Sequence, residues 1–325
     1  MKKIMSLVMS FCLCMTFVMP GFALAATSDE IANAKVGDSL SPTTPSDKLA
    51  LAEKFLYGTA QEGALVTRTE SMEQDIYGGI VNEGLVARIN RLYNYLVVGV
   101  TADGTPSMQS KINAIEWQFM DSMSEAPGKT RIENIEKMLS GQINSNDSLS
   151  NRVDKLLNDA FPDGFLVAQK TVVPKDTLIK IKFMEEISSR EVAKGDLVKF
   201  KADDNIYIDD ALVIPKGSLG IGLIRKVSQP SSFGRDARID IQFTSINAVD
   251  GTRIPIFLGE LAKQEGESIA GAAGASIGGM IIAGPIGIIG GAFVKGKAVV
   301  IPAGTTTVIQ VLEDTPVMGL MQGTK

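Results

Sequence analysis

The chain has 325 residues, a formal net charge of −5 and a sequence pI near 5.1. It contains no histidine and two cysteines, Cys12 and Cys14. Imidazole and thiolate groups serve in most general acid–base catalysis near neutral pH and in most zinc sites, so their scarcity argues against an enzyme, a metal site or a bound cofactor. The acidic balance, with no Lys/Arg-rich run, argues against a nucleic-acid partner.

The first 25 residues follow the pattern of a bacterial signal peptide. Lys2 and Lys3 precede an apolar stretch from Ile4 to Met19, and Ala23–Ala25 forms an A-x-A cleavage site. Cleavage there would remove both cysteines and leave a mature chain without a thiol. We therefore expect export with release after Ala25, followed by a polar, proline-containing linker over 26–47.

Six units of about 20 residues follow one another over 48–164. Each opens on a basic residue and carries apolar residues at helical spacing, as at Ile132, Ile135, Met138 and Leu139. The opening residues are Lys48, Arg68, Arg88, Lys111, Arg131 and Arg152, and Gly58, Gly78, Gly99, Gly141 and Gly164 are suited to cap helix ends. Helices this short do not persist alone in water, so the units must bury their apolar stripes against one another or against a partner chain.

The aromatic residues of these units leave two interpretations open. Tyr57, Tyr77, Tyr93 and Trp117 are either core aromatics of a helical array or a ligand-binding surface. The units resemble the R-I-x-x-[LI]-E…[FY]-G repeats of exported proteins of some diderm bacteria, whose role is not established. This resemblance implies no mechanism.

The period of the apolar residues changes from helical to two in the second half, over 165–265 and 297–318. The residues expected to point inward are Ile179, Ile181, Phe183, Val198, Phe200, Ile239, Ile241 and Phe243. This alternation predicts half-buried antiparallel strands.

Three similar motifs, VVPKDT, VIPKGS and VIPAGT, begin at Val172, Val213 and Val300. We expect Pro174, Pro215 and Pro302 to fix φ at the second position of a tight turn, and Gly217 and Gly304 to supply the φ that closes it. Each motif should then start a strand at a corner of one barrel.

The order of these motifs resembles the C-terminal β-barrel of TrbI-type subunits of conjugation and type IV secretion outer-membrane complexes. Thr177, Asp204–Tyr207, Ile214–Ser218 and Asp250-Gly251 fall at places that match the family pattern. The resemblance implies a barrel that carries an inserted apolar helical hairpin. Subunits of that family normally have a cytoplasmic N-terminus and an inner-membrane helix, so the resemblance does not extend to membership of a secretion machine.

The glycine-rich stretch at 266–296 takes the place of that hairpin. Gly271, Ala275, Gly279, Ala283, Gly287 and Gly291 recur at every fourth residue. Such a stripe lets two helix backbones approach closely, and Pro285 favours a bend and a return. Glycine costs about 1 kcal/mol relative to alanine in a solvated helix, so the stretch should be ordered in lipid or, alternatively, as a hairpin packed on the β-domain.

The acidic pairs Asp203-Asp204 and Asp209-Asp210 could suggest calcium, but the spacing of a calcium loop fails at Tyr207, which favours solvated turns. A hydrolase that uses carboxylates or Ser/Lys is the enzyme alternative, and no spacing points to it.

The sequence thus predicts an α+β protein with a short-helix array, an antiparallel β-barrel-like domain and a glycine-zipper hairpin. The predicted function is that of a non-enzymatic envelope protein in the periplasm or outer membrane of a diderm bacterium. Expected partners are outer-membrane lipid and a second copy or an envelope protein, with no small-molecule substrate. The alternative is a soluble extracellular binding module for cell-wall glycan or a protein partner.

Overall fold

The computed structural model describes residues 42, 44–99, 104–162, 164–229, 237–272 and 298–324. The predicted signal peptide and most of the predicted linker lie outside these residues. So do six of the seven predicted hairpin positions, Ala275, Gly279, Ala283, Pro285, Gly287 and Gly291. Gly271 falls within a described helix, α8 (Glu260–Ala272).

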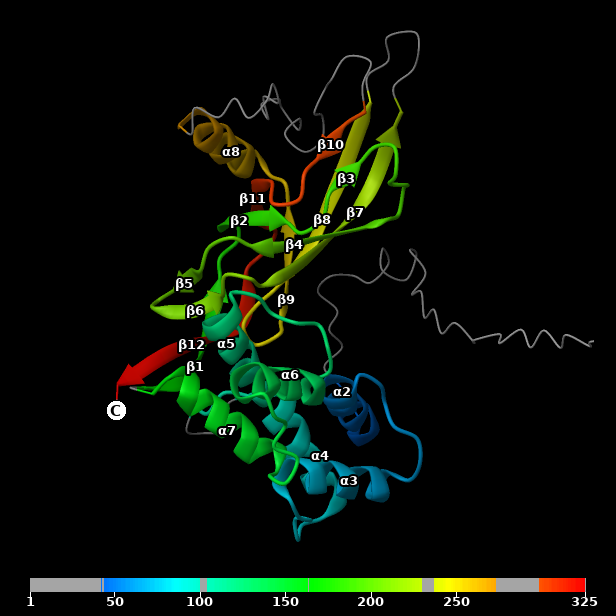
Figure 1. Cartoon of the computed structure of the whole chain (residues 1–325), viewed down its shortest axis with the longest axis vertical. Helices are drawn as coiled ribbons and strands as arrows, with labels where there is room; N and C mark the ends of the chain where they lie inside the picture. The colour runs from blue at the N-terminus through cyan, green and yellow to red at the C-terminus, as the bar shows by residue number, and fades with distance from the viewer. Residues whose placement is uncertain are drawn as a thin grey trace, which may run out of the picture. The chain divides into compact units, whose positions relative to one another are not determined.

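The fold is α+β, as predicted, with helices first and antiparallel strands after them (Figure 1). The helices of the first half are α2 (Pro45–Tyr57), α3 (Leu65–Tyr77), α4 (Leu85–Tyr93), the π-helix η1 (Asn94–Val98), α5 (Met108–Met120), α6 (Gly128–Ser140) and α7 (Leu149–Ala160). Each α-helix begins three residues before its basic residue. For α2 this lies inside the predicted linker, because the Thr44 side chain accepts a hydrogen bond from Asp47 N–H and starts the helix earlier.

Glycines end four of the helices as the sequence predicts. Gly99 ends η1 with φ of +69°, and its N–H bonds Asn94 O. Gly58, Gly78 and Gly141 have φ of +88°, +76° and +75°, and each N–H bonds the carbonyl four residues earlier. The prediction for Gly164 was wrong, since α7 ends against Phe161 and Gly164 opens strand β1. A Cβ there would lie 2.7 Å from Gly323 O, so the glycine allows close strand pairing instead.

The helices bury their apolar stripes against one another, one of the two outcomes expected. Ile132 and Ile135 of α6 are fully buried, in a core that also contains Leu56, Ile89 and Leu96. Met138 and Leu139, which were predicted to continue the stripe of α6, are 49% and 44% exposed. The buried stripe of α6 ends instead at Glu136, and residues 137–140 of the last turn are all exposed.

Six strands close into a barrel in the order β11-β2-β4-β7-β8-β9, and every neighbouring pair is antiparallel (Figure 1). Their bounds are β2 (Leu178–Phe183), β4 (Leu197–Ala202), β7 (Leu219–Ser228), β8 (Arg238–Asn247), β9 (Arg253–Phe257) and β11 (Thr306–Val311). A four-stranded sheet has the order β1-β12-β6-β5, with β1 (Gly164–Val173), β12 (Thr315–Thr324), β6 (Ala211–Ile214) and β5 (Ile206–Ile208). Strands β3 (Ile187–Ser188) and β10 (Val300–Ile301) form a separate pair.

Strand β12 runs past the predicted end of the β-domain at residue 318. It pairs with β1 over ten residues, from Thr315↔Val173 to Thr324↔Gly164. Backbone hydrogen bonds along this ladder, rather than side-chain alternation, order the last residues of the strand.

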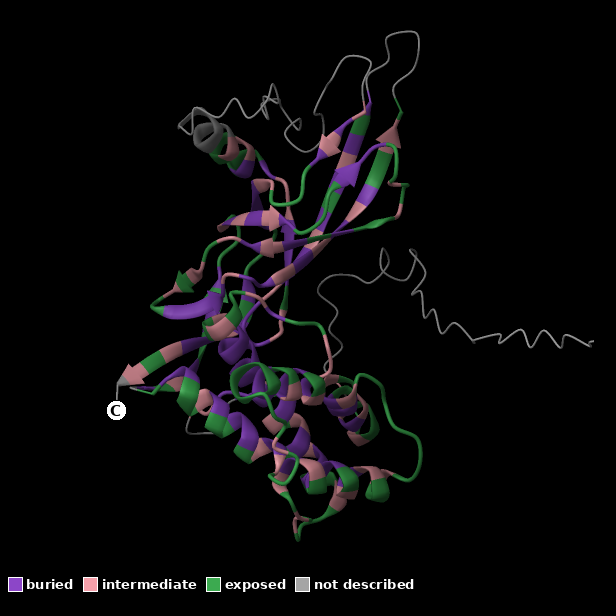
Figure 2. Cartoon of the chain, in the orientation of Figure 1, coloured by how far each residue is buried: buried purple, intermediate pink, exposed green. Residues whose placement is uncertain are grey.

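The barrel interior confirms the predicted alternation. All eight residues expected to point inward are at most 7% exposed, and they belong to one apolar core. Phe200 and Phe243 meet edge to face with ring centroids 5.4 Å apart. Figure 2 shows buried and exposed positions alternating along the barrel strands.

The three proline motifs lead into β2, β7 and β11, but the prolines occupy the first turn position rather than the second. The carbonyls of Pro174, Pro215 and Pro302 accept hydrogen bonds of 3.2, 3.0 and 3.2 Å from the N–H groups of Thr177, Ser218 and Thr305. Only the carbonyl is used at that position, so the missing proline N–H costs nothing. The residues with positive φ follow two places later, at Asp176 (+65°), Gly217 (+89°) and Gly304 (+83°).

Candidate functional site: buried ion pairs and the helix–barrel junction

A buried glutamate lies five residues after the basic residue in four of the six units. These are Glu53, Glu73, Glu116 and Glu136. Each carboxylate binds the guanidinium that opens the next unit, in the pairs Glu53–Arg68, Glu73–Arg88, Glu116–Arg131 and Glu136–Arg152, with N–O distances of 2.6–2.7 Å. Each also accepts a backbone N–H eight residues downstream, from Gln61, Val81, Ser124 and Asn144, at 2.8–3.3 Å.

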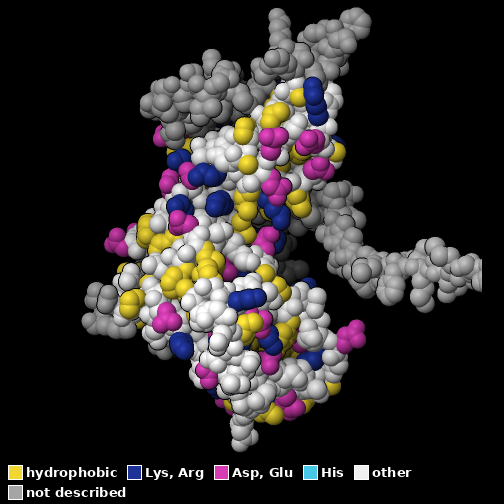
Figure 3. Space-filling view, in the orientation of Figure 1, with side chains coloured by type: hydrophobic (Ala, Val, Ile, Leu, Met, Phe, Trp, Pro, Cys, Tyr) yellow, Lys and Arg dark blue, Asp and Glu magenta, His cyan; other side chains and the backbone are white. Residues whose placement is uncertain are grey.

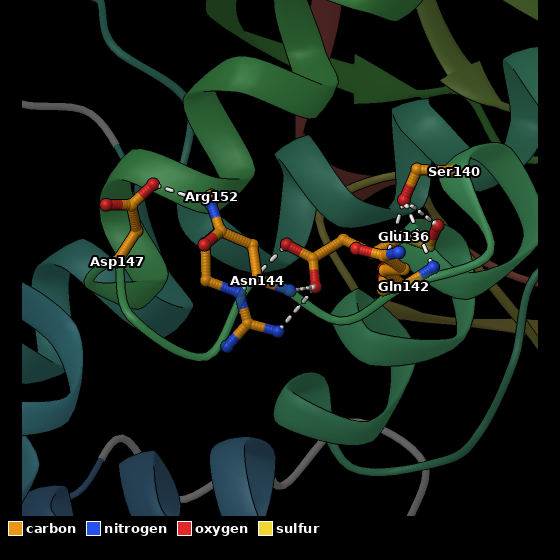
Figure 4. A network of polar contacts seen from close by, with 6 residues as sticks. All are labelled: Glu136, Ser140, Gln142, Asn144, Asp147 and Arg152. Carbon is orange, nitrogen blue, oxygen red and sulfur yellow. Dashed lines mark hydrogen bonds and ion pairs between the residues drawn. The ribbon is translucent and has the colours of Figure 1, made fainter.

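Figure 4 shows the fourth of these networks, with Glu136 bonded to both Arg152 and Asn144. The carboxylate therefore fixes the connection that leaves its own helix and the start of the helix that follows. Buried charges are tolerated only when they are paired and hydrogen-bonded. Here the Glu136 carboxylate binds both the Arg152 guanidinium and the Asn144 N–H, which meets this requirement. The pair is a structural device of the repeat.

The third and sixth units depart from this pattern, with Tyr93 and Leu157 in the glutamate position. Instead, the third unit contacts the first unit, and the sixth unit contacts the fourth. Lys48 Nζ donates to Asn90 Oδ1 and Lys111 Nζ pairs with Asp154 Oδ1, both at 2.7 Å. Since Asn90 and Asp154 each lie two residues after the opening arginine, the six helices form two equivalent three-helix sets.

Helix α5 connects the second three-helix set to the strands. Asn113 Nδ2 donates to Val249 O at 2.8 Å, and Trp117 Nε1 donates to Asn205 Oδ1 at 3.0 Å. At the end of the helix, Gly217 packs so closely that a Cβ would lie 2.4 Å from Asp121 O. The turn before β7 and the end of α5 are thus in direct contact.

The four aromatic residues singled out in the sequence all make internal contacts. Tyr57 Oη donates to Asp75 Oδ2 at 3.0 Å, and Trp117 packs partly buried against the helical core. Burial raises the pKa of Tyr77 to about 12. Tyr93 lies beneath Lys48 Nζ, 6.0 Å from its ring centroid. These contacts favour the interpretation as core aromatics.

A cavity of 470 Å³ lies where α2, α5, the α5–α6 connection and the β8–β9 turn meet. Its lining includes the charged side chains Lys54, Glu125, Arg131 and Arg253 and the amides Gln109, Asn113 and Asn247. Sequence reasoning missed this cavity, because its walls come from segments far apart along the chain.

Both acidic pairs lie at turns. Burial raises the pKa of the Asp203 carboxyl, but ion pairs with Lys182 at 2.5 Å and Lys180 at 3.1 Å outweigh it and leave the pKa below its usual value. Asp209 and Asp210 form the turn between β5 and β6, both with positive φ. Over the described ranges, no three His, Cys, Asp or Glu side chains gather as metal ligands would.

The face in Figure 3 carries basic and acidic side chains interspersed, with no extended patch of one sign. In the part of the chain that the structure describes, the longest apolar helical stretches fall short of what a membrane crossing requires.

No protein-family model matches the chain, and no curated protein matches it. Among solved structures it is similar to ComB10 of the Com type IV secretion system of Helicobacter pylori. The two share 16% sequence identity, and the match covers 44% of this chain and 88% of that chain with a TM-score of 0.26. A similarity at this level carries no argument about function.

Proposed function

We propose that the chain is a non-enzymatic, exported cell-envelope protein that associates with the outer membrane and self-assembles through its glycine-zipper segment and its helical repeats. The observation that carries the proposal is the composition of the glycine-rich stretch. It carries no charge from Ser268 to Val294, and small residues recur at every fourth place. A lipid environment or a second copy would satisfy such a backbone, whereas water would not.

The elements on either side of the stretch belong to the same β-domain. Before it, α8 contacts strand β11, where Ala262 N–H donates to Gln310 Oε1 at 3.1 Å. After it, Val299 and β10 join the barrel core. Because both flanking elements belong to one folded body, we propose a hairpin that enters the membrane and returns rather than a single crossing.

Fractionation of a diderm host that exports the full chain tests this function. We expect the mature protein in the outer-membrane fraction after both high-salt and carbonate washes. A matched variant replaces 266–296 with a Gly/Ser/Asn segment of equal length, and we expect it in the soluble fraction. Release of the unaltered protein by salt or carbonate alone would contradict the proposal, and cell-wall glycan pull-down retained by the variant would favour the soluble binding module.

A further inference from the structure

The 470 Å³ cavity between α2, α5, the α5–α6 connection and the β8–β9 turn, called here the junction cavity, concentrates positive charge on a chain that is acidic overall. Lys54 and Arg253 line it, and both are exposed. Within the described ranges, neither side chain forms an ion pair or a hydrogen bond with another residue. Two uncompensated cations on one cavity attract an anionic group.

The other charged residues of the lining are already neutralised. Arg131 pairs with Glu116 at 2.6 Å and also donates to Asn113 Oδ1. Glu125 pairs with Lys199 at 3.4 Å. The uncompensated charge of the cavity is therefore that of Lys54 and Arg253.

Two amides provide further hydrogen-bonding capacity. Gln109 and Asn247 are half-buried in the lining, and their side chains bond no other described residue. Gln109 is held against Gly251, where a Cβ would lie 1.9 Å from its amide nitrogen, and a Cβ at Gly58, on another wall, would lie 2.8 Å from Pro127 Cγ. Both glycines have positive φ, so these walls depend on residues that tolerate few substitutions.

We propose that this cavity binds a compact, polyhydroxylated carboxylate, of which a sugar acid is the simplest example. The guanidinium of Arg253 and the ammonium of Lys54 would hold the carboxylate, since charge-assisted hydrogen bonds to carboxylates are the strongest available here. The Gln109 and Asn247 amides would bond the hydroxyl groups. A volume of 470 Å³ lies within the range of about 300–1,000 Å³ of small-molecule pockets.

Calorimetric titration of the full mature chain with glucuronate, glucose and acetate tests the proposal. The chain offers a close control for Lys54: Lys137 holds the equivalent place in the last turn of α6, six residues after the opening basic residue, and is not in the lining. Arg225, exposed on β7 and also outside the lining, is the control for Arg253. The variants are therefore K54Q/R253Q and K137Q/R225Q, with thermal unfolding of each as a check on folding.

We expect glucuronate to bind more tightly than glucose or acetate, and K54Q/R253Q to weaken its binding by at least about tenfold, as loss of charge-assisted hydrogen bonds implies. K137Q/R225Q should retain the affinity of the unaltered chain. Absence of glucuronate binding, equal binding of glucose or acetate, or equal losses in the two double variants would overturn the proposal. None of these results depends on membrane association.

Discussion

Glu73 and Arg88 form an ion pair in the helical core, with Oε2 and Nη2 2.6 Å apart and side chains that are 0% and 9% exposed. The same carboxylate accepts the Val81 N–H, and Glu70 Oε1 lies 4.0 Å from the guanidinium. Nearby, Glu83 and Arg91 form a second pair in which the side chains are 36% and 50% exposed. The two pairs allow a direct comparison of buried and solvated charge.

The first prediction concerns Glu73→Ala. Removing one member of a buried pair leaves the other charge without compensation, so we expect a loss of about 3–5 kcal/mol in the free energy of unfolding. Glu83→Ala should cost less than about 1 kcal/mol, as exposed pairs do. Urea unfolding followed by far-UV circular dichroism measures both, and similar losses in the two variants would show that the buried pair has no special role.

The second prediction compares two glycines at the same place of the proline motif. Gly217 and Gly304 have φ of +89° and +83°, so an alanine at either is strained by about 1–2 kcal/mol. A Cβ at Gly304 meets nothing within 4 Å, whereas one at Gly217 would collide with Asp121.

We therefore expect Gly217→Ala to destabilise the protein more than Gly304→Ala, by a further amount on the order of 1–3 kcal/mol for the overpacked contact. Thermal unfolding of both variants measures the difference. Equal effects would mean that the turn before β7 does not pack against the end of α5 in solution.

The third prediction concerns alkaline pH. Burial is the main cause that raises the pKa of Tyr77 to about 12, so its neutral phenol is favoured in the folded protein. The contribution of the neutral Tyr77 phenol to the free energy of unfolding is complete below the usual tyrosine pKa of about 10. It is lost as the pH rises through about 12.

Tyr77→Phe should accordingly reduce the fall in unfolding free energy between these two pH values. Urea unfolding at a series of alkaline pH values, read beside phenolate absorbance, measures the effect. The control variant is Tyr207→Phe, because Tyr207 is 52% exposed. An identical change in the pH profiles of the two variants would contradict burial as the cause of the raised pKa of Tyr77.

Local patterns in the sequence predicted the elements well. Apolar residues at period two placed Ile179, Ile181 and Phe183 inside the barrel, because a strand sends alternate side chains to opposite faces. Glycines 58, 78 and 141 indicated helix ends, since a left-handed residue closes them.

The same rules did not find left-handed residues of another type. Asp121 ends α5 with φ of +48°, and Asp176 takes the glycine position of the first proline motif with φ of +65°. Aspartate adopts the left-handed conformation less readily than glycine, so the residue type did not predict a positive φ at either position.

Long-range partners were beyond sequence reasoning. The basic residues that open the units were visible, but for the four arginines the buried glutamate partner lies 15 or 16 residues earlier, a spacing that no single-helix rule connects. The contact between Trp117 and Asn205 spans 88 positions and depends on how the helices meet the strands. The junction cavity has the same origin.

The most direct test of the central claim, that the glycine-rich stretch mediates membrane association and self-assembly, is the size of the mature chain in solution. Light scattering coupled to gel filtration, with and without detergent, would compare it with a deletion lacking 266–296. We expect the full chain to form a defined oligomer in detergent and to aggregate without it, while the size of the deletion is the same in both conditions. A full chain that is a stable monomer without detergent, with a size unchanged by detergent, would rule out this role of the stretch.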